Sequence, residues 1–387
     1  MKLVVSRAPG VERVVTPLEL FFDLVYVFAI GELAHHLLAH VDVRTGAETG
    51  ILALAVIYAW FMTAWGLNWL DPDKLAVRLL LVGLMFASLL MSVSIADAFG
   101  DRAWLFVTSY LALQIGRCAF LIVALRGRAL SAHFVNDLVW ELSTGALWVA
   151  GAFTDGDARL VLWGLAVVAT HAGVGSLHWL PWRGRAIDVA HTEIAATHLF
   201  ERFRLFFIIA LGESVLSAGN AFVAEPFTPA RLAALAIAFA GTVALWWCYF
   251  YRAEGIAAEA VDAADDAGAV GLRGTWTLTL LVLALIGIAV GDELAIAHPG
   301  DDATLGFTLL TFGGAALFLL AQTLFMTRTT GSAPRSRLVA LGTLLVLAFA
   351  TAPLSLVAGI AATTAVLIAV AAADTLSRAS AARAAAG

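Results

Sequence analysis

The sequence predicts an all-α polytopic membrane protein with about twelve transmembrane helices, and three observations lead to this fold class. Of the 387 residues, 61% are hydrophobic and only 13% are charged, whereas soluble globular domains carry roughly 25% charged residues. Apolar runs of about 20 residues, enough to cross ~30 Å of hydrocarbon, recur along the chain. The connecting segments also alternate between many and few basic residues, as they do in multi-pass proteins.

The apolar runs give the expected elements in chain order. We expect transmembrane helices over residues 17–39, 50–70, 75–97, 102–125, 136–153, 159–180, 195–219, 229–251, 275–297, 303–327, 336–351 and 353–375. The fifth and eleventh runs are the shortest. Their bounds are therefore the least well defined by hydropathy.

Basic residues predict the orientation of these helices. One set of connecting segments and the two termini carry Lys2, Arg7, Arg13, Lys74, Arg78, Arg126, Arg128, Arg183, Arg185, Arg252, Arg273, Arg328, Arg335, Arg337, Arg378 and Arg383. The opposite set carries only Arg44, Arg102, Arg159 and Arg231. Since cytoplasmic segments are enriched in Lys and Arg, we expect both termini in the cytoplasm and an even number of spans.

Parts of the chain repeat, which suggests two halves of six helices each. At an offset of 181 residues (197 − 16), residues 16–32 align with 197–213 and Trp65 aligns with Trp246. We expect a first half over 1–185 and a second over 186–387, with an acidic cytoplasmic loop at 253–274. Halves separated by an even number of crossings run parallel, as in several transporters with a site between repeats.

The first expected span carries two acids near its start. Thr16 and Pro17 suit the N-cap and the first helical position, and Glu19 and Asp23 stand four residues apart on one face. These acids could form a proton or cation site. Alternatively, Glu19 interacts with the helix dipole and Asp23 forms a salt bridge with Arg202 or Arg204. Glu32 lies near the other end of this span. It could also belong to a proton or metal site, or it could simply stand at an exposed helix end.

The seventh expected span has the densest set of polar residues. At 100° per residue, one narrow sector contains His198, Arg202 and Glu213, with Glu201 beside it. Charged groups at membrane depth face the bundle interior or a wet cavity. Asp292, in the ninth span, is a further candidate. No spacing matches a metal-binding signature, so we expect no bound metal and no other cofactor.

Other polar residues within the apolar runs need partners. Arg117 stands in the middle of the fourth span, and Asp137 and Glu141 stand four apart in the fifth. His171 and His178 are seven apart in the sixth, which would place them on one helix face.

Three blocks of sequence resemble the bacterial low temperature requirement A (LtrA) family. They are the run from Thr16 to Ala29 (TPLELFFDLVYVFA), Asn68-Trp69-Leu70-Asp71-Pro72-Asp73, and the segment from His198 through Ser214. The resemblance implies a multi-pass protein of the bacterial cytoplasmic (inner) membrane, linked by family name to growth in the cold. It supplies no reaction. A histidine typical of the family is missing from residues 273–279 of this chain.

These observations favour a transporter or channel-like protein rather than an enzyme. Its polar pathway would lie between the two repeats and use Glu19, Asp23, Glu32, His198, Glu201, Arg202, Glu213 and Asp292. An intramembrane enzyme acting on a lipid-type substrate, or a non-catalytic scaffold or sensor, is the alternative. Expected partners are the lipid bilayer and a small molecule or ion, and homo-oligomerisation stays open. The chain lacks the basic runs that bind nucleic acid.

Overall fold

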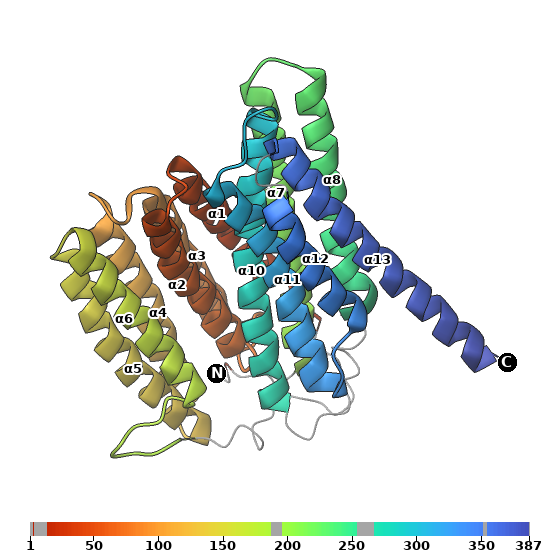
Figure 1. Cartoon of the computed structure of the whole chain (residues 1–387). Coiled ribbons are helices and arrows are strands. Elements are labelled where there is room, and N and C mark those ends of the chain that lie inside the picture. The colour runs from red at the N-terminus through yellow and green to blue at the C-terminus, as the bar shows by residue number, and fades with distance from the viewer. Residues whose placement is uncertain (1–2, 4–13, 187–195, 254–266, 351–353, 387) are drawn as a thin grey trace. The chain divides into compact units, whose positions relative to one another are not determined.

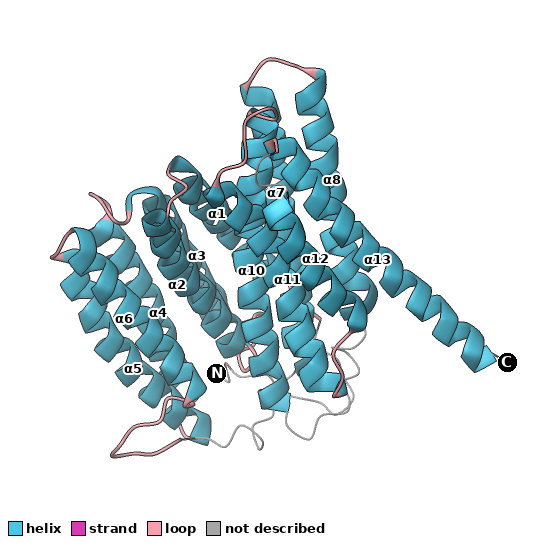
Figure 2. Cartoon of the chain, viewed as in Figure 1, coloured by secondary structure: helices cyan, strands magenta, loops and turns pink. Residues whose placement is uncertain are grey.

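A computed structural model describes residues 3, 14–186, 196–253, 267–350 and 354–386 of the chain (Figure 1). Over these residues the regular structure consists of twelve α-helices, one short 3-10 turn and one π turn. Figure 2 shows the same residues as helices and connecting loops. The all-α fold class predicted from the sequence is therefore confirmed.

The helices follow the predicted runs one for one. They are α1 (Pro17–Ala39), α2 (Val43–Leu67), α3 (Leu75–Ser94), α4 (Ala103–Ala124), α5 (Ala129–Ala152), α6 (Gly156–Gly175), α7 (Ala196–Ala224), α8 (Pro229–Cys248), α10 (Ala267–Ala297), α11 (Leu305–Thr330), α12 (Arg335–Ala350) and α13 (Leu356–Ala386). The start of α10 falls within the segment predicted as an acidic loop, and residues 254–266 of that loop lie outside the described part.

Nine of the twelve described helices are long and apolar enough to cross a membrane, all except α1, α5 and α12. These three share a feature, because each carries charged side chains that the fold buries completely. Glu19 and Asp23 belong to α1, Asp137 and Glu141 to α5, and Arg337 to α12. The three described helices that fall short of a membrane span in length or composition are thus among those that hold the buried charges.

The start of α1 has the cap that its sequence predicts. The backbone N–H and the hydroxyl of Thr16 each donate to Oε2 of Glu19, at 2.9 Å. The N–H of Glu19 donates in return to the Thr16 hydroxyl, at 3.4 Å. This reciprocal capping box satisfies donors that a helix start leaves without partners. It also fixes the Glu19 side chain at the first turn.

Two compact units make up the chain, and each is described by itself. The first contains residues 1–36, 44–202 and 265–271, and in it α3, α4, α5 and α6 pack in chain order. The second contains residues 37–43, 203–264 and 272–387, and in it α8 packs against α13 while α11, α12 and α13 pack on one another. The boundary falls inside α7, directly after Arg202, so that the start of α7 belongs to the first unit.

Small residues allow close helix packing in the second unit. A Cβ atom built on Gly314 of α11 would lie 3.0 Å from the backbone O of Ala284 and 3.2 Å from the backbone N of Ile288, both in α10. On the adjacent Gly313, a Cβ would meet nothing within 4 Å. Small side chains at helix interfaces serve this purpose in membrane proteins.

We expect Gly314→Ala to destabilise the protein by about 1–3 kcal/mol, because backbone atoms of α10 must move to accept the methyl group. Gly313→Ala is the matched control on the same helix. It should leave stability unchanged or raise it by up to about 1 kcal/mol, since Ala is the better helix former. The midpoint of thermal unfolding of detergent-purified protein measures both effects, and equal shifts in the two variants would contradict the packing argument.

Candidate functional site

The acids of α1 meet the basic residues at the start of α7. Oε1 of Glu19 lies 3.3 Å from Nε2 of His198. One turn further along both helices, Oδ1 of Asp23 forms an ion pair with Nη2 of Arg202. All four side chains are buried, with at most 1% of their surface exposed. We call these four residues, together with Trp60, the α1–α7 cluster.

Sequence spacing explains why the two pairs form. Glu19 and Asp23 are four residues apart on α1, and so are His198 and Arg202 on α7, so each helix presents one group per turn on one face. Of the two partners predicted for Asp23, the structure selects Arg202. Arg204 is exposed.

Aromatic rings complete the surroundings of Arg202. Its guanidinium carbon lies 5.8 Å from the ring centre of Phe22 and 5.6 Å from that of Trp60. Cation–π contacts at such distances stabilise a buried cation. The indole N–H of Trp60 also donates to Oδ1 of Asp23, at 2.7 Å. Asp23 therefore accepts from a guanidinium and an indole at the same oxygen.

The two ion pairs account for four of the eight predicted pathway residues. Of the others, Glu32 and Glu201 are half-buried in the first unit. Glu213 is half-buried in the second unit and accepts a hydrogen bond from the Ser217 hydroxyl at 3.3 Å. Asp292 is buried in the second unit, on α10. That all eight residues line one polar pathway stays a prediction.

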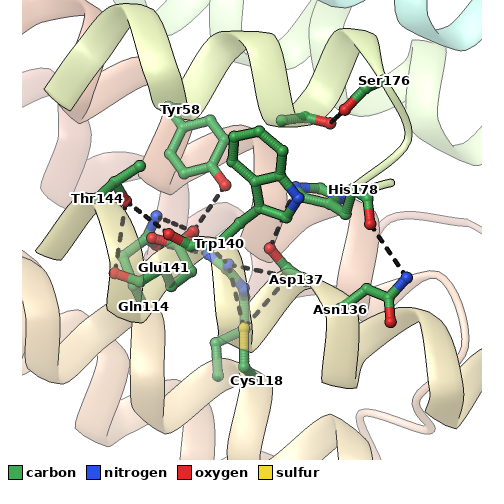
Figure 3. A network of polar contacts seen from close by, with 12 residues as sticks. Tyr58, Gln114, Cys118, Asn136, Asp137, Trp140, Glu141, Thr144, Ser176 and His178 are labelled. Atoms are coloured by element: carbon green, nitrogen blue, oxygen red, sulfur yellow. Dashed lines mark hydrogen bonds and ion pairs between the residues drawn. The ribbon is translucent and has the colours of Figure 1, made fainter. Parts of the chain in front are cut away.

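A second buried polar cluster lies in the first unit, between α2, α4 and α5 (Figure 3). Nη2 of Arg117 lies 3.4 Å from Oδ2 of Asp137 and 3.3 Å from Oε1 of Glu141. The same Glu141 oxygen accepts from the Tyr58 hydroxyl at 2.6 Å and from Nε2 of Gln114 at 2.9 Å. We call this the Arg117 network.

The loop after α6 adds a histidine to this network. Nε2 of His178 lies 3.3 Å from Oδ1 of Asp137. Leu177 and His178 both have positive φ, 57° and 52°, a left-handed conformation that non-glycine residues seldom adopt. The side-chain amide of Asn136 donates to the backbone O of His178 at 3.1 Å and of Gly184 at 3.0 Å. These two hydrogen bonds hold the loop in a strained form that directs His178 inward.

Single residues of the Arg117 network stand out in the sequence, but the sequence did not predict that they contact one another. It singled out Arg117 as needing a partner and noted Asp137 and Glu141 four apart. It placed His178 on one helix face with His171, and this was wrong because α6 ends at Gly175. His171 instead contacts the backbone O of Val167 at 2.9 Å.

A third buried cluster of charged residues, after the α1–α7 cluster and the Arg117 network, lies in the second unit. Nη2 of Arg337 on α12 lies 2.9 Å from Oδ2 of Asp374 on α13. The Arg337 side chain also donates to Oε1 of Gln322, at 2.9 and 3.1 Å. This pair matches one guanidinium with one carboxylate, whereas the Arg117 network has two carboxylates for one guanidinium.

The side chains of these buried clusters are suited to charge pairing and proton exchange. Over the described residues, no group of three or more His, Cys, Asp and Glu side chains is placed to hold a metal ion. The two cysteines are buried free thiols. Carboxylates facing imidazoles at 3.3 Å, as in Glu19–His198 and Asp137–His178, are arrangements in which a proton can move between the two groups.

Comparisons with known proteins agree with the sequence blocks noted above. The family described as bacterial low temperature requirement A protein (LtrA) matches residues 14–372. An uncharacterised protein of Rhizobium meliloti (strain 1021) is 33% identical over 318 residues, which cover 81% of this chain and 76% of the relative. No solved structure matches. The chain is thus a multi-pass membrane protein that belongs to the bacterial low temperature requirement A (LtrA) family.

Proposed function

We propose that the protein is a transporter or channel-like protein of the bacterial cytoplasmic (inner) membrane, with a small molecule or ion as its substrate. Its polar pathway uses the α1–α7 cluster. The proposal includes cytoplasmic N- and C-termini and two parallel six-helix halves, because the basic residues and the repeated segments of the sequence favour both.

One observation carries the proposal. Glu19, Asp23, His198 and Arg202 are almost completely buried in helices of a membrane protein. Charged side chains at membrane depth are costly, and where they persist they commonly mark substrate or ion pathways and proton relays. The Glu19–His198 pair is the part best suited to a changing charge, because both of its groups can gain or lose a proton.

Glu19→Gln is the most informative substitution. Gln serves in a capping box as well as Glu does, so the hydrogen bonds from Thr16 to this side chain can remain while the negative charge is lost. A protein that uses Glu19 in its pathway should lose transport. A scaffold that uses Glu19 only as a helix cap should be unaffected.

Proteoliposomes with a trapped pH dye and a potassium diffusion potential provide the assay, with sodium and potassium gradients as further arms. We expect wild-type protein to conduct, and Glu19→Gln to reduce the flux to that of empty vesicles. The matched control Glu225→Gln removes an exposed acid of the α7–α8 loop and should leave flux unchanged. Absence of flux in the wild type in every arm, or full flux in Glu19→Gln, would overturn the proposal.

A further inference from the structure

The Arg117 network contains one carboxylate more than it has fixed positive charges. Asp137 and Glu141 are 0% and 1% exposed, and in the part of the chain that the structure describes Arg117 is the one guanidinium that contacts them. Over the described residues, the other titratable groups that face the network from α2, α4, α5, α6 and the following loop are Tyr58, Tyr110, Cys118, His133, His171 and His178. Tyrosine and cysteine are neutral in their ordinary state. The charge balance therefore depends on the histidines.

None of the histidines supplies the missing charge at neutral pH. Burial lowers the pKa of His178, although the carboxylate of Asp137 opposes this effect. Nε2 of the neutral imidazole lies 3.3 Å from Oδ1 of Asp137, although this contact lacks hydrogen-bond geometry. The ring of His133 packs edge-on against those of Trp65 and His178, and its Nδ1 has no hydrogen-bond partner over the described residues.

Unpaired oxygen atoms show where the excess charge would lie. Oε1 of Glu141 accepts from Tyr58, Gln114 and Arg117, whereas Oε2 is buried without a hydrogen-bond partner over the described residues. Oδ1 of Asp137 also lacks a partner of hydrogen-bond geometry. An ionised carboxylate with a buried oxygen and no donor is strongly disfavoured. Two carboxylates that share one site commonly hold a proton between them.

The strained loop that carries His178 also borders an open pocket. His178 is 3% exposed, but the loop around it is open to the outside. A pocket of about 540 Å³ at this loop is lined by Ser176, Trp179 and Arg185, on both sides of His178 in the chain. Backbone strain maintained by tertiary hydrogen bonds is common at functional positions. Here the strained residue, His178, contacts Asp137 and stands between the pocket residues Ser176 and Trp179 in the chain.

We propose that Asp137 and Glu141 together bind one exchangeable proton, and that His178 passes this proton between the pair and the loop pocket. Inward transfer forms an N–H bond at Nδ1 from a hydronium ion, breaks the Nε2–H bond and forms an O–H bond on the carboxylate pair. The ring stays neutral and emerges as the other tautomer. Proton binding of this kind holds whether or not the protein transports a substrate.

Neutralising either acid should abolish the site, because the remaining carboxylate then matches Arg117. Infrared difference spectra of the full-length protein between alkaline and acidic pH detect the C=O stretch of a buried carboxylic acid. We expect a component of this band in the wild type that is lost in both Glu141→Gln and Asp137→Asn. The control Asp292→Asn removes a buried acid of the second unit, so it should lower the total band but retain the component that the two network variants remove.

A second readout is the unfolding temperature as a function of pH. The folded network holds a proton that the unfolded chain has released above about pH 4.3, the ordinary pKa of Glu. The native state then binds more protons, so stability must fall as pH rises through the range in which the network gives up its proton. Glu141→Gln should flatten this dependence and be the more stable form at alkaline pH.

The relay role of His178 has its own measurement. After a rapid pH jump, His178→Gln should keep the amplitude of the carboxyl band but reach it more slowly than the wild type. Full amplitude reached at the wild-type rate would overturn the relay. Folded wild-type protein without such a band, or a band of equal amplitude in the wild type, Glu141→Gln and Asp137→Asn, would overturn the proton site itself.

Discussion

Arg117→Leu is expected to be the most damaging single substitution in the first unit. Arg117 is 1% exposed, and its guanidinium contacts both Asp137 and Glu141. Removing one partner of a buried ion pair costs about 3–5 kcal/mol, because the other charge remains buried and uncompensated. Here Asp137 and Glu141, which by our proposal share one proton, lose the cation that balances their remaining negative charge. Total stabilities of about 5–15 kcal/mol leave little margin for such a loss.

The measurement is the yield of monodisperse detergent-purified protein and its unfolding midpoint. Arg78→Leu is the matched control, because Arg78 also forms an ion pair with an aspartate, Asp73, but the two side chains are 55% and 80% exposed. Exposed pairs contribute at most about 1 kcal/mol. The triple variant Arg117→Leu/Asp137→Asn/Glu141→Gln should recover much of the stability. An Arg117→Leu protein as stable as Arg78→Leu would refute the electrostatic account.

The number and order of the helices could be predicted from the sequence because each depends on local composition. Apolar length sets each helix, and polar residues end it. The cap of α1 is equally local, since Thr16, Pro17 and Glu19 lie within four positions. The pairing of Asp23 with Arg202 was among the predicted alternatives because both residues stand on repeating helix faces.

The contacts of the Arg117 network could not be predicted from local sequence. Whether Arg117 lies level with Asp137 or with another acid depends on how α4 and α5 slide along one another, and hydropathy does not record that register. His178 was misplaced for a different reason. The apolar run continues through Leu177 and Trp179, while the helix has already ended at Gly175. The bonds from Asn136 that hold the loop are tertiary contacts between distant parts of the chain.

Asp23→Asn is expected to have the next largest effect. Arg202 is 0% exposed, and Asp23 is the carboxylate with which it forms an ion pair. In Asp23→Asn a neutral amide oxygen replaces the carboxylate. Over the described residues, the cation is then supported mainly by the rings of Phe22 and Trp60, which supply about 2 kcal/mol or more when desolvated. We therefore expect a loss of about 3–5 kcal/mol in unfolding free energy. A loss below about 1 kcal/mol would show that the pair behaves as an exposed one.

The double variant Asp23→Leu/Arg202→Met separates a structural role of this pair from a role in transport. Replacing both partners of a buried ion pair by apolar residues is often neutral or stabilising. The indole N–H of Trp60, which donates to Asp23 at 2.7 Å, would lose its acceptor at a cost of about 1–3 kcal/mol. Adding Trp60→Phe removes that donor. If the pair only joins α1 to α7, the triple variant should regain wild-type stability and, in proteoliposomes, wild-type flux. If the pair belongs to the pathway, stability should return while flux does not, and this second outcome is the one we expect.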